Sequence, residues 1–106
     1  MQTGRRRHQS EQEGIMGQDR EQKGSVIDQL EAVRAAVREE TMTPERRAEM
    51  EAALSGLERE LMVAMPVDAA PLVALLQGWE ARLEAEHPVL ASVVGDALQK
   101  LSSMGI

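Results

Sequence analysis

The spacing Glu84-x-x-His87 is the arrangement in this 106-residue chain that comes nearest to a metal-binding motif. Residues three apart share one face of an α-helix, so a carboxylate and an imidazole would lie together, as in di-iron helical bundles. Those sites need a second such motif and two further inward-facing glutamates. A symmetric dimer could duplicate the motif, but the apolar stripes of the preceding helices carry no glutamate. The favoured interpretation is that His87 caps the next helix and Glu84 is solvated.

Nucleophilic catalysis has less support. His8 lies in a polar N-terminal segment, which leaves His87 as the candidate base, and the chain has neither a nucleophile-elbow motif nor a Gly-rich phosphate loop. Ser102 and Ser103 lie next to the expected end of the last helix, where serine is common. We therefore expect no enzymatic activity, no cofactor and no metal, with a metal-binding enzyme using Glu84 and His87 as the remote alternative.

The composition favours helices packed on helices. Trp79 is the sole aromatic residue, so a core must come from Leu, Val, Met and Ala, and no long run alternates apolar and polar residues. The chain has no cysteine, so it has no disulfide framework and no thiolate metal site. That is compatible with a reducing location, and we expect a cytoplasmic all-α protein.

The charge is distributed unevenly along the chain. Residues 1–24 hold five basic and four acidic side chains, whereas the remainder holds seven basic and 14 acidic ones, a net charge of −7. An acidic body repels nucleic acid and anionic lipid, so we expect neither as a partner. No apolar run reaches the roughly 18 to 20 residues that span a bilayer. Arg5-Arg6-Arg7 is followed by polar residues, so no export signal can be identified.

Residues 1–24 are predicted to be a disordered tail. They are rich in Gln, Glu, Arg and Gly, and after the first residue Ile15 and Met16 are the only bulky apolar side chains. Such a segment cannot bury enough surface to offset the entropy of ordering it. Met16 offers an alternative translation start, which mass spectrometry of the native N-terminus would test. The single ordered domain is expected over residues 25–106.

The first two helices are expected over residues 26–40 and 44–64. Ser25 and Asp28 resemble a capping box, and the apolar spacing continues through Ile27, Leu30, Val33 and Val37. Thr43-Pro44 supplies an N-cap and a first helical residue for the second helix. Its apolar residues alternate in steps of four and three, the heptad spacing of a coiled coil: Met50, Leu54, Leu57, Leu61 and Ala64. The short link between the helices predicts an antiparallel hairpin.

The third helix, expected over residues 69–86 after Asp68, carries two stripes. Its apolar stripe consists of Leu72, Leu75, Leu76, Trp79 and Leu83. On the opposite side lie the small residues Ala74, Gly78, Ala81 and Ala85. Glycine at position 78 costs about 1 kcal/mol relative to alanine in a solvated helix, which suggests that another backbone approaches there. Alternatively, Gly78 is merely tolerated.

His87-Pro88 interrupts the helical pattern, because Pro88 has no N–H to donate and disfavours helical geometry at His87. Pro88 can begin a fourth helix, expected over residues 88–104, whose apolar face carries Leu90, Val94, Ala97, Leu98 and Leu101. With Gly105 just past its end, Leu101 and Ile106 take the two positions that a Schellman motif brings into contact.

The segment from Leu83 to Ala91, with Asp96-Ala97-Leu98 and the terminal Met104-Gly105-Ile106, resembles the family catalogued as domain of unknown function 4404. The resemblance is strongest over residues 79–106 and implies a short bacterial helical protein. Leu83 stands where that family suggests Phe, and the first helix lacks the expected His and Glu. The resemblance implies a fold and no reaction.

We therefore expect an all-α protein: an antiparallel hairpin, then two helices hinged at His87-Pro88, in a small bundle. An ordered region of about 80 residues is marginal alone, which favours a non-catalytic module that self-associates through apolar helix faces, most simply as a dimer. The alternative is a regulatory adaptor that binds a helix of another protein. The expected interaction or structural residues are Met50, Leu54, Leu57, Leu61, Leu72, Leu76, Trp79, Leu83, His87, Pro88, Leu90, Val94, Leu98, Leu101, Gly105 and Ile106.

Overall fold

The computed structural model describes residues 2–64 and 66–104, with side chains described from residue 21 onward. Four helices account for most of them, and no strand occurs among them: α1 (Gln2–Glu39), α2 (Pro44–Val63), α3 (Ala70–Glu86) and α4 (Pro88–Ser103). The predicted all-α class and element order are confirmed.

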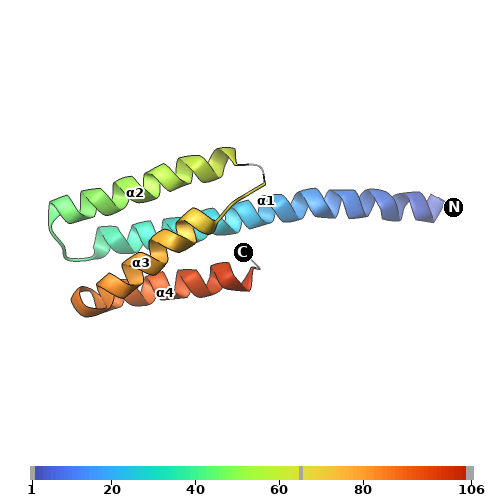
Figure 1. Ribbon diagram of the computed structural model, residues 1–106. Helices are drawn as coiled ribbons and strands as arrows, with labels where there is room; N and C mark the ends of the chain where they lie inside the picture. The colour runs from blue at the N-terminus through green and yellow to red at the C-terminus, as the bar shows by residue number, and fades with distance from the viewer. Residues whose placement is uncertain (1, 65, 105–106) are drawn as a thin grey trace.

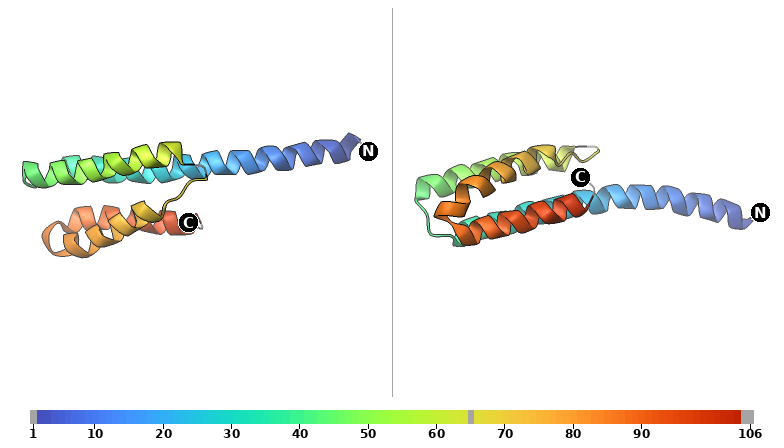
Figure 2. Two further views of the ribbon diagram at one scale, coloured as in Figure 1. Left: turned by 45° about the horizontal axis from the view of Figure 1, so that its top comes forward. Right: turned by 60° about the horizontal axis from the view of Figure 1, so that its bottom comes forward.

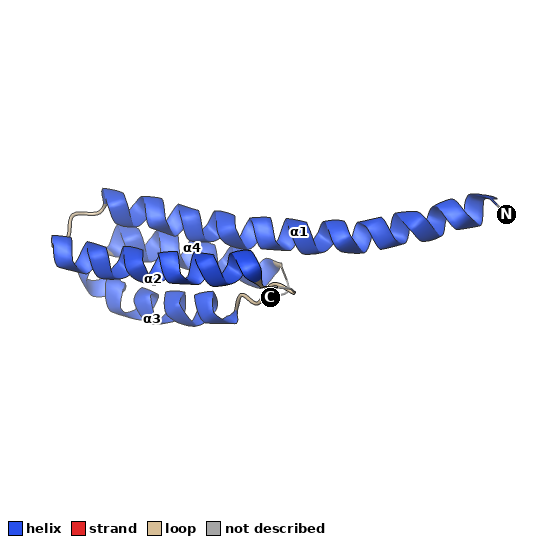
Figure 3. Ribbon diagram, turned by 90° about the horizontal axis from the view of Figure 1, so that it is seen from above, coloured by secondary structure: helices blue, strands red, loops and turns tan. Residues whose placement is uncertain are grey.

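The helices form two layers of two (Figure 2). α1 and α2 make an antiparallel hairpin, and α3 and α4 make a second pair joined at His87-Pro88 (Figure 1). Seen from above, α4 lies behind α1 and α2, between them, and α3 runs along the side of α2 that faces away from α1 (Figure 3). The closest pairings are α3 with α4, α1 with α4, and α1 with α2. α3 is therefore held mainly by α4.

The core contains 17 buried hydrophobic side chains, and no polar or charged side chain is buried among the described residues. Within α2, α3 and α4 the buried residues largely follow the predicted stripes, although Leu57, Leu75 and Leu98 are only partly buried and α4 also buries Ala91. In α1 the buried set is Val26, Leu30, Val33 and Val37, so the expectation that Ile27 starts the stripe is wrong by one position. Val26 is four residues before Leu30, and Ile27 lies on the edge of the contact.

The helix ends are fixed by local hydrogen bonds. The Thr43 Oγ1 accepts the Arg46 N–H at 3.2 Å, and Pro44 takes the first position of α2, as predicted. Asp68 Oδ1 accepts the Ala70 N–H at 3.0 Å at the start of α3. The His87 N–H donates to the Leu83 carbonyl at 2.7 Å, and its own carbonyl accepts from the Ala91 N–H at 2.9 Å. The backbone of His87 therefore ends α3 and begins α4, while its side chain makes no cap hydrogen bond.

Ser25, the predicted N-cap of the first helix, lies inside α1, which extends to Gln2. Most of the predicted tail, from Gln2 onward, continues α1 and projects beyond the bundle (Figure 1), while near its end Lys23 Nζ donates to the Met62 carbonyl of α2 at 3.0 Å. A helix of 38 residues is about 57 Å long at 1.5 Å per residue, which accounts for the 64 Å long axis of the molecule. Among the described side chains, burial in the core starts at Val26, in keeping with the polar composition of the preceding segment.

None of the helices in the described part of the chain is both long enough and apolar enough to cross a membrane.

Candidate interaction surface

The outer side of the α3–α4 pair carries an open groove with a volume of about 790 Å³. On the α3 side it is bounded by the flank between the buried stripe and the small-residue stripe. On the α4 side small residues predominate, because the larger side chains of that helix face the core. The groove is lined by Val73, Gln77, Glu80, Glu84, Pro88, Ala91, Ser92, Gly95, Asp96, Leu98, Gln99 and Ser102.

Every ionisable side chain that lines this groove is acidic. Glu80 and Glu84 are one turn apart on α3, and Asp96 lies on α4. None of the three forms an ion pair with a basic side chain in residues 21–64 and 66–104. The groove thus combines apolar contacts from Val73 and Leu98 with unneutralised negative charge.

Gly95 lets the carboxylate of Glu80 lie directly against α4. A Cβ atom added at Gly95 would meet Glu80 Oε2 at 2.5 Å, which is too close for an undisturbed contact. The clash would be with the end of a flexible side chain, so it could be relieved by moving that carboxylate. The absence of a side chain at Gly95 therefore leaves room for the Glu80 carboxylate against α4.

The small-residue stripe of α3 faces solvent. Ala74, Gly78, Ala81 and Ala85 are all exposed. A Cβ atom added at Gly78 would meet nothing within 4 Å, so no contact inside the described chain requires glycine there. The glycine lowers helix propensity without an internal packing reason.

Glu84 and His87 do not share a site. Glu84 is exposed and lines the groove, whereas His87 Nδ1 lies 3.5 Å from Glu40 Oε1, at the end of α1. Glu40 Oε1 also accepts the Thr41 N–H at 3.2 Å. No group of three or more His, Cys, Asp or Glu side chains suited to a metal occurs within the ranges that the structure describes.

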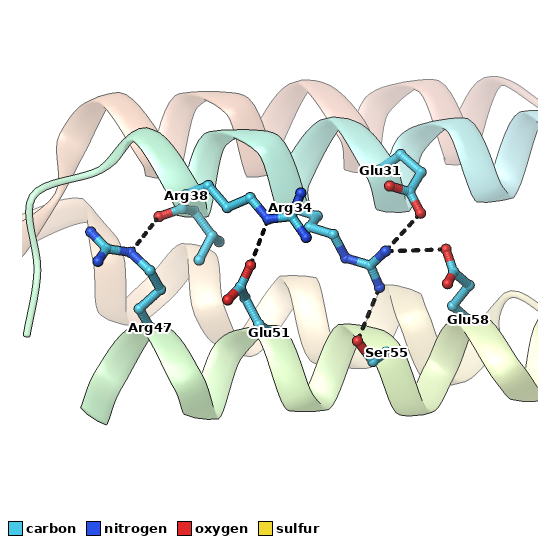
Figure 4. Close-up of polar contacts among 8 residues, drawn as sticks. Glu31, Arg34, Arg38, Arg47, Glu51, Ser55 and Glu58 are labelled. Atoms are coloured by element: carbon cyan, nitrogen blue, oxygen red, sulfur yellow. Dashed lines mark hydrogen bonds and ion pairs between the residues drawn. The ribbon is translucent and has the colours of Figure 1, made fainter. Parts of the chain in front are cut away.

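Arg47 closes the same end of the bundle. Its Nη2 donates to the Glu40 carbonyl at 2.6 Å, and its Nε donates to the Val37 carbonyl at 3.4 Å. Figure 4 shows Arg47 on α2 reaching toward α1. Carbonyls in the last turn of a helix have no partner within it, so Arg47 stabilises the end of α1.

A polar network joins the exposed edges of α1 and α2 (Figure 4). Arg34 Nη1 lies 2.9 Å from Glu31 and 3.3 Å from Glu58, and Arg34 Nη2 donates to Ser55 Oγ at 3.2 Å. Further along, Arg38 Nε lies 2.7 Å from Glu51. This edge is therefore occupied by the contacts of the hairpin itself.

Glu31 and Glu58 have pKa values displaced in opposite directions. Hydrogen bonding with Glu58, followed by partial burial, raises the pKa of Glu31, although Arg34 opposes the change. The same hydrogen bond, followed by Arg34, lowers the pKa of Glu58 in spite of partial burial. Glu31 is therefore expected to lose its proton at a higher pH than Glu58.

A smaller cavity of about 160 Å³ lies between α2 and α3, which are the loosely paired neighbours in the bundle. It is lined by Leu57, Glu60, Leu61, Ala64, Asp68, Pro71 and Leu72. Close to it in sequence are Met62 and Val63, which with Val89 are the exposed large hydrophobic residues of the described chain.

Most of the residues predicted from the sequence to make interactions are buried inside the chain. Leu57 lines the small cavity, and Pro88 and Leu98 line the groove. Gly105 and Ile106, with their expected Schellman motif, lie outside the described residues. The remaining apolar candidates are buried in the core of one chain: Met50, Leu54, Leu61, Leu72, Leu76, Trp79, Leu83, Leu90, Val94 and Leu101.

Sequence reasoning did not identify the groove. Glu80 and Glu84 are recognisable as one flank of α3, and Gly95 interrupts the apolar pattern of α4, but these segments are 15 residues or so apart in the chain. Only the pairing of α3 with α4 places them together. The one indication in the sequence was Gly95 in the middle of the fourth predicted helix, because a glycine inside a helix often has a packing or functional reason.

The fold and this surface define a small all-α domain built from two helical hairpins. Residues 26–106 match the model of the family described as a domain of unknown function (DUF4404), and the chain belongs to that family. The match includes the first hairpin as well as the C-terminal third, and its start coincides with Val26, where packing begins. Neither the curated proteins nor the solved structures gave a match to this chain.

Proposed function

We propose that this protein is a non-catalytic interaction module that self-associates, most simply as a two-fold dimer, through the exposed small-residue face of α3. The observation that carries the proposal is Gly78, an exposed glycine in the middle of a 17-residue helix with open space around it. Packing of a second helix on Ala74, Gly78 and Ala81 would explain why these residues are small, because small residues allow two helix backbones to approach closely.

The interface would be modest in size. The large apolar side chains are already used in the core of one chain, so the contact would consist mainly of the small side chains of α3. Interfaces that bury less than about 1,200 Å² in total are characteristic of weak association. A reversible dimer is therefore expected, with more dimer at higher protein concentration.

Sedimentation velocity or light scattering coupled to size exclusion tests this proposal over a range of micromolar concentrations. Ala81→Lys should shift the chain to monomer, because a long charged side chain would be placed between the two helices. Ala52→Lys is the matched control, since Ala52 is an exposed alanine in the middle of α2. A monomer at every concentration would overturn self-association, and equal effects of both variants would overturn the choice of α3.

A second candidate function is a regulatory adaptor that takes a helix from another protein. The acidic groove between α3 and α4 favours it, because that groove is open and unneutralised in the single chain. The net charge of −7 over residues 25–106 argues against nucleic acid and anionic membranes as partners. The absence of cysteine supports a proposed cytoplasmic location. A metal enzyme using Glu84 and His87 is not favoured, because His87 has Glu40 as its neighbour.

A further inference from the structure

We infer that the α3–α4 groove is a docking site for a cationic amphipathic helix of another protein. This inference rests on the proposed role as an interaction module, but it assigns a different surface from the one proposed for self-association. It names the chemistry of the partner: an apolar stripe flanked by lysine or arginine.

The shape of the groove suits a helix lying along it. The lining residues of α4 run from Pro88 to Ser102, a length of about 21 Å at 1.5 Å per residue, which matches about four helical turns. Ala91, Ser92, Gly95 and Ser102 form the α4 wall, and such small side chains allow a helix to approach closely. The groove lies between two helices with internally bonded backbones, so it offers no strand edge to an extended peptide.

The lining also has the apolar contacts that an amphipathic helix needs. Val73 on α3 and Leu98 on α4 are partly buried and line the groove, and the buried Ala91 adds to its apolar lining. An apolar stripe of the partner would contact Val73 and Leu98. Helix-in-groove binding of this kind uses anchors spaced three and four residues apart.

The negative charge of the groove lining determines which charge its partner should carry. Glu80 and Glu84 are four residues apart on α3, and Asp96 lies on α4, so all the formal charge of the lining is negative. Bringing lysine or arginine to these carboxylates would neutralise them, and the charge of −7 over residues 25–106 would speed the approach of a cation. An acidic partner would be repelled.

The test uses the full chain and a fluorescein-labelled synthetic helix of 18 residues, with leucines at helical spacing on one face and lysines on both flanks. Two control peptides carry glutamate in place of lysine, or serine in place of leucine. Fluorescence anisotropy at low and moderate salt should show binding of the Lys/Leu peptide and at least tenfold weaker binding of both controls. Amide shifts in an NMR titration should be largest at Ser92, Gly95 and Ser102.

Variants of the protein locate the site. Glu80→Lys/Glu84→Lys should weaken binding at least tenfold, whereas Glu45→Lys/Glu49→Lys should change it less than twofold. The control pair has the same spacing and the same change of charge, and both glutamates are exposed on α2. Gly95→Leu should also abolish binding by filling the groove, and circular dichroism would check that each variant is folded.

Two results would overturn the inference: equal weakening by both charge-reversal pairs, or binding by the Glu/Leu peptide as tight as by the Lys/Leu peptide. A third overturning result is loss of self-association in Glu80→Lys/Glu84→Lys, which would mean that the groove holds a second copy. Light scattering on the same variant separates the two proposals, since self-association through Ala81 should survive it. If self-association fails in the wild type while the peptide still binds, only the dimer proposal is lost.

Discussion

The imidazole Nδ1 of His87 lies 3.5 Å from the carboxylate Oε1 of Glu40, and this contact joins the α3–α4 corner to the end of α1. Both side chains are about four-fifths shielded from solvent, with exposed fractions of 18% and 21%. Glu40 also accepts from the Thr41 N–H, and its carbonyl accepts from Arg47. One residue therefore ties together the turn of the first hairpin and the corner of the second.

Replacing Glu40 should destabilise the bundle, because its side chain contacts both His87 and the Thr41 N–H. We expect Glu40→Ala to lower the free energy of unfolding by about 1 kcal/mol, the usual net value of a hydrogen bond or two at a partly buried position. Urea denaturation followed by circular dichroism would measure it. Glu39→Ala is the control, because Glu39 is exposed and has no hydrogen bond or ion pair among the described side chains.

A double-mutant cycle with His87→Ala would show whether the contact itself is responsible. Coupling between Glu40 and His87 of about 0.5 kcal/mol or more is expected for residues in direct contact. Additive effects would mean that Glu40 acts only through Thr41 and the backbone.

The sequence could predict the stripes but not their exact edges. Thr43-Pro44 and His87-Pro88 carry strong local signals for helix ends, so the boundaries there agree with the structure to within a residue. The choice between Val26 and Ile27 has no such signal, because both fit helical spacing to Leu30. Packing against α4 and α2 decides it, and that information is not local.

Because Val26 is fully buried and Ile27 is not, truncating the smaller residue should destabilise the fold more than truncating the larger one. Val26 is fully buried, whereas Ile27 is only partly buried, although isoleucine is the larger side chain. We expect Val26→Ala to cost about 1.5 to 3 kcal/mol, since a buried side chain loses its apolar contacts and leaves a cavity. Ile27→Ala should cost clearly less. Thermal or urea unfolding of the two variants would compare them, and a larger effect at Ile27 would contradict the observed face of α1.

The groove could not be predicted from the sequence either, because it depends on contacts between residues that are distant along the chain. Glu80 and Gly95 lie on different helices, and their proximity depends on the sharp corner at His87-Pro88. The sequence indicates that a bend occurs at Pro88. It does not fix the angle, which is set by the packing of Leu83, Leu90 and the residues around them.

Glu31 and Glu58 should titrate in separate steps. The pKa of Glu31 is raised by its hydrogen bond with Glu58, and the pKa of Glu58 is lowered by the same bond. A raised pKa stabilises the fold below the unfolded pKa, and that contribution is lost as pH rises through the folded pKa. A lowered pKa contributes above the unfolded pKa, and that contribution is lost as pH falls. Both contributions are therefore present together only near the unfolded pKa of glutamate, so this pair should give the fold a maximum of stability there, with a decline on either side.

Carboxyl NMR titration would separate the two groups. Glu31 should lose its proton at higher pH than Glu58, and Glu58→Gln should lower the pKa of Glu31, because the negative acceptor is removed while Arg34 remains. Ser55→Ala is a suitable control, since it removes a different contact of Arg34. An unchanged pKa of Glu31 in Glu58→Gln would show that Glu58 does not raise the pKa of Glu31.

Substitutions at Ser25 and Thr43 would show whether α1 begins at the bundle, near Ser25, or continues past it. In the structure Ser25 lies within α1, whereas Thr43 caps α2 through a hydrogen bond to the Arg46 N–H. Thr43→Ala should therefore cost about 1 kcal/mol, the usual value of an N-cap. Ser25→Ala should be neutral or stabilise by a few tenths of a kcal/mol, because alanine favours a helix interior. If Ser25→Ala instead costs as much as Thr43→Ala in urea denaturation, Ser25 is the working start of the helix and residues 1–24 form the disordered tail that their composition predicts.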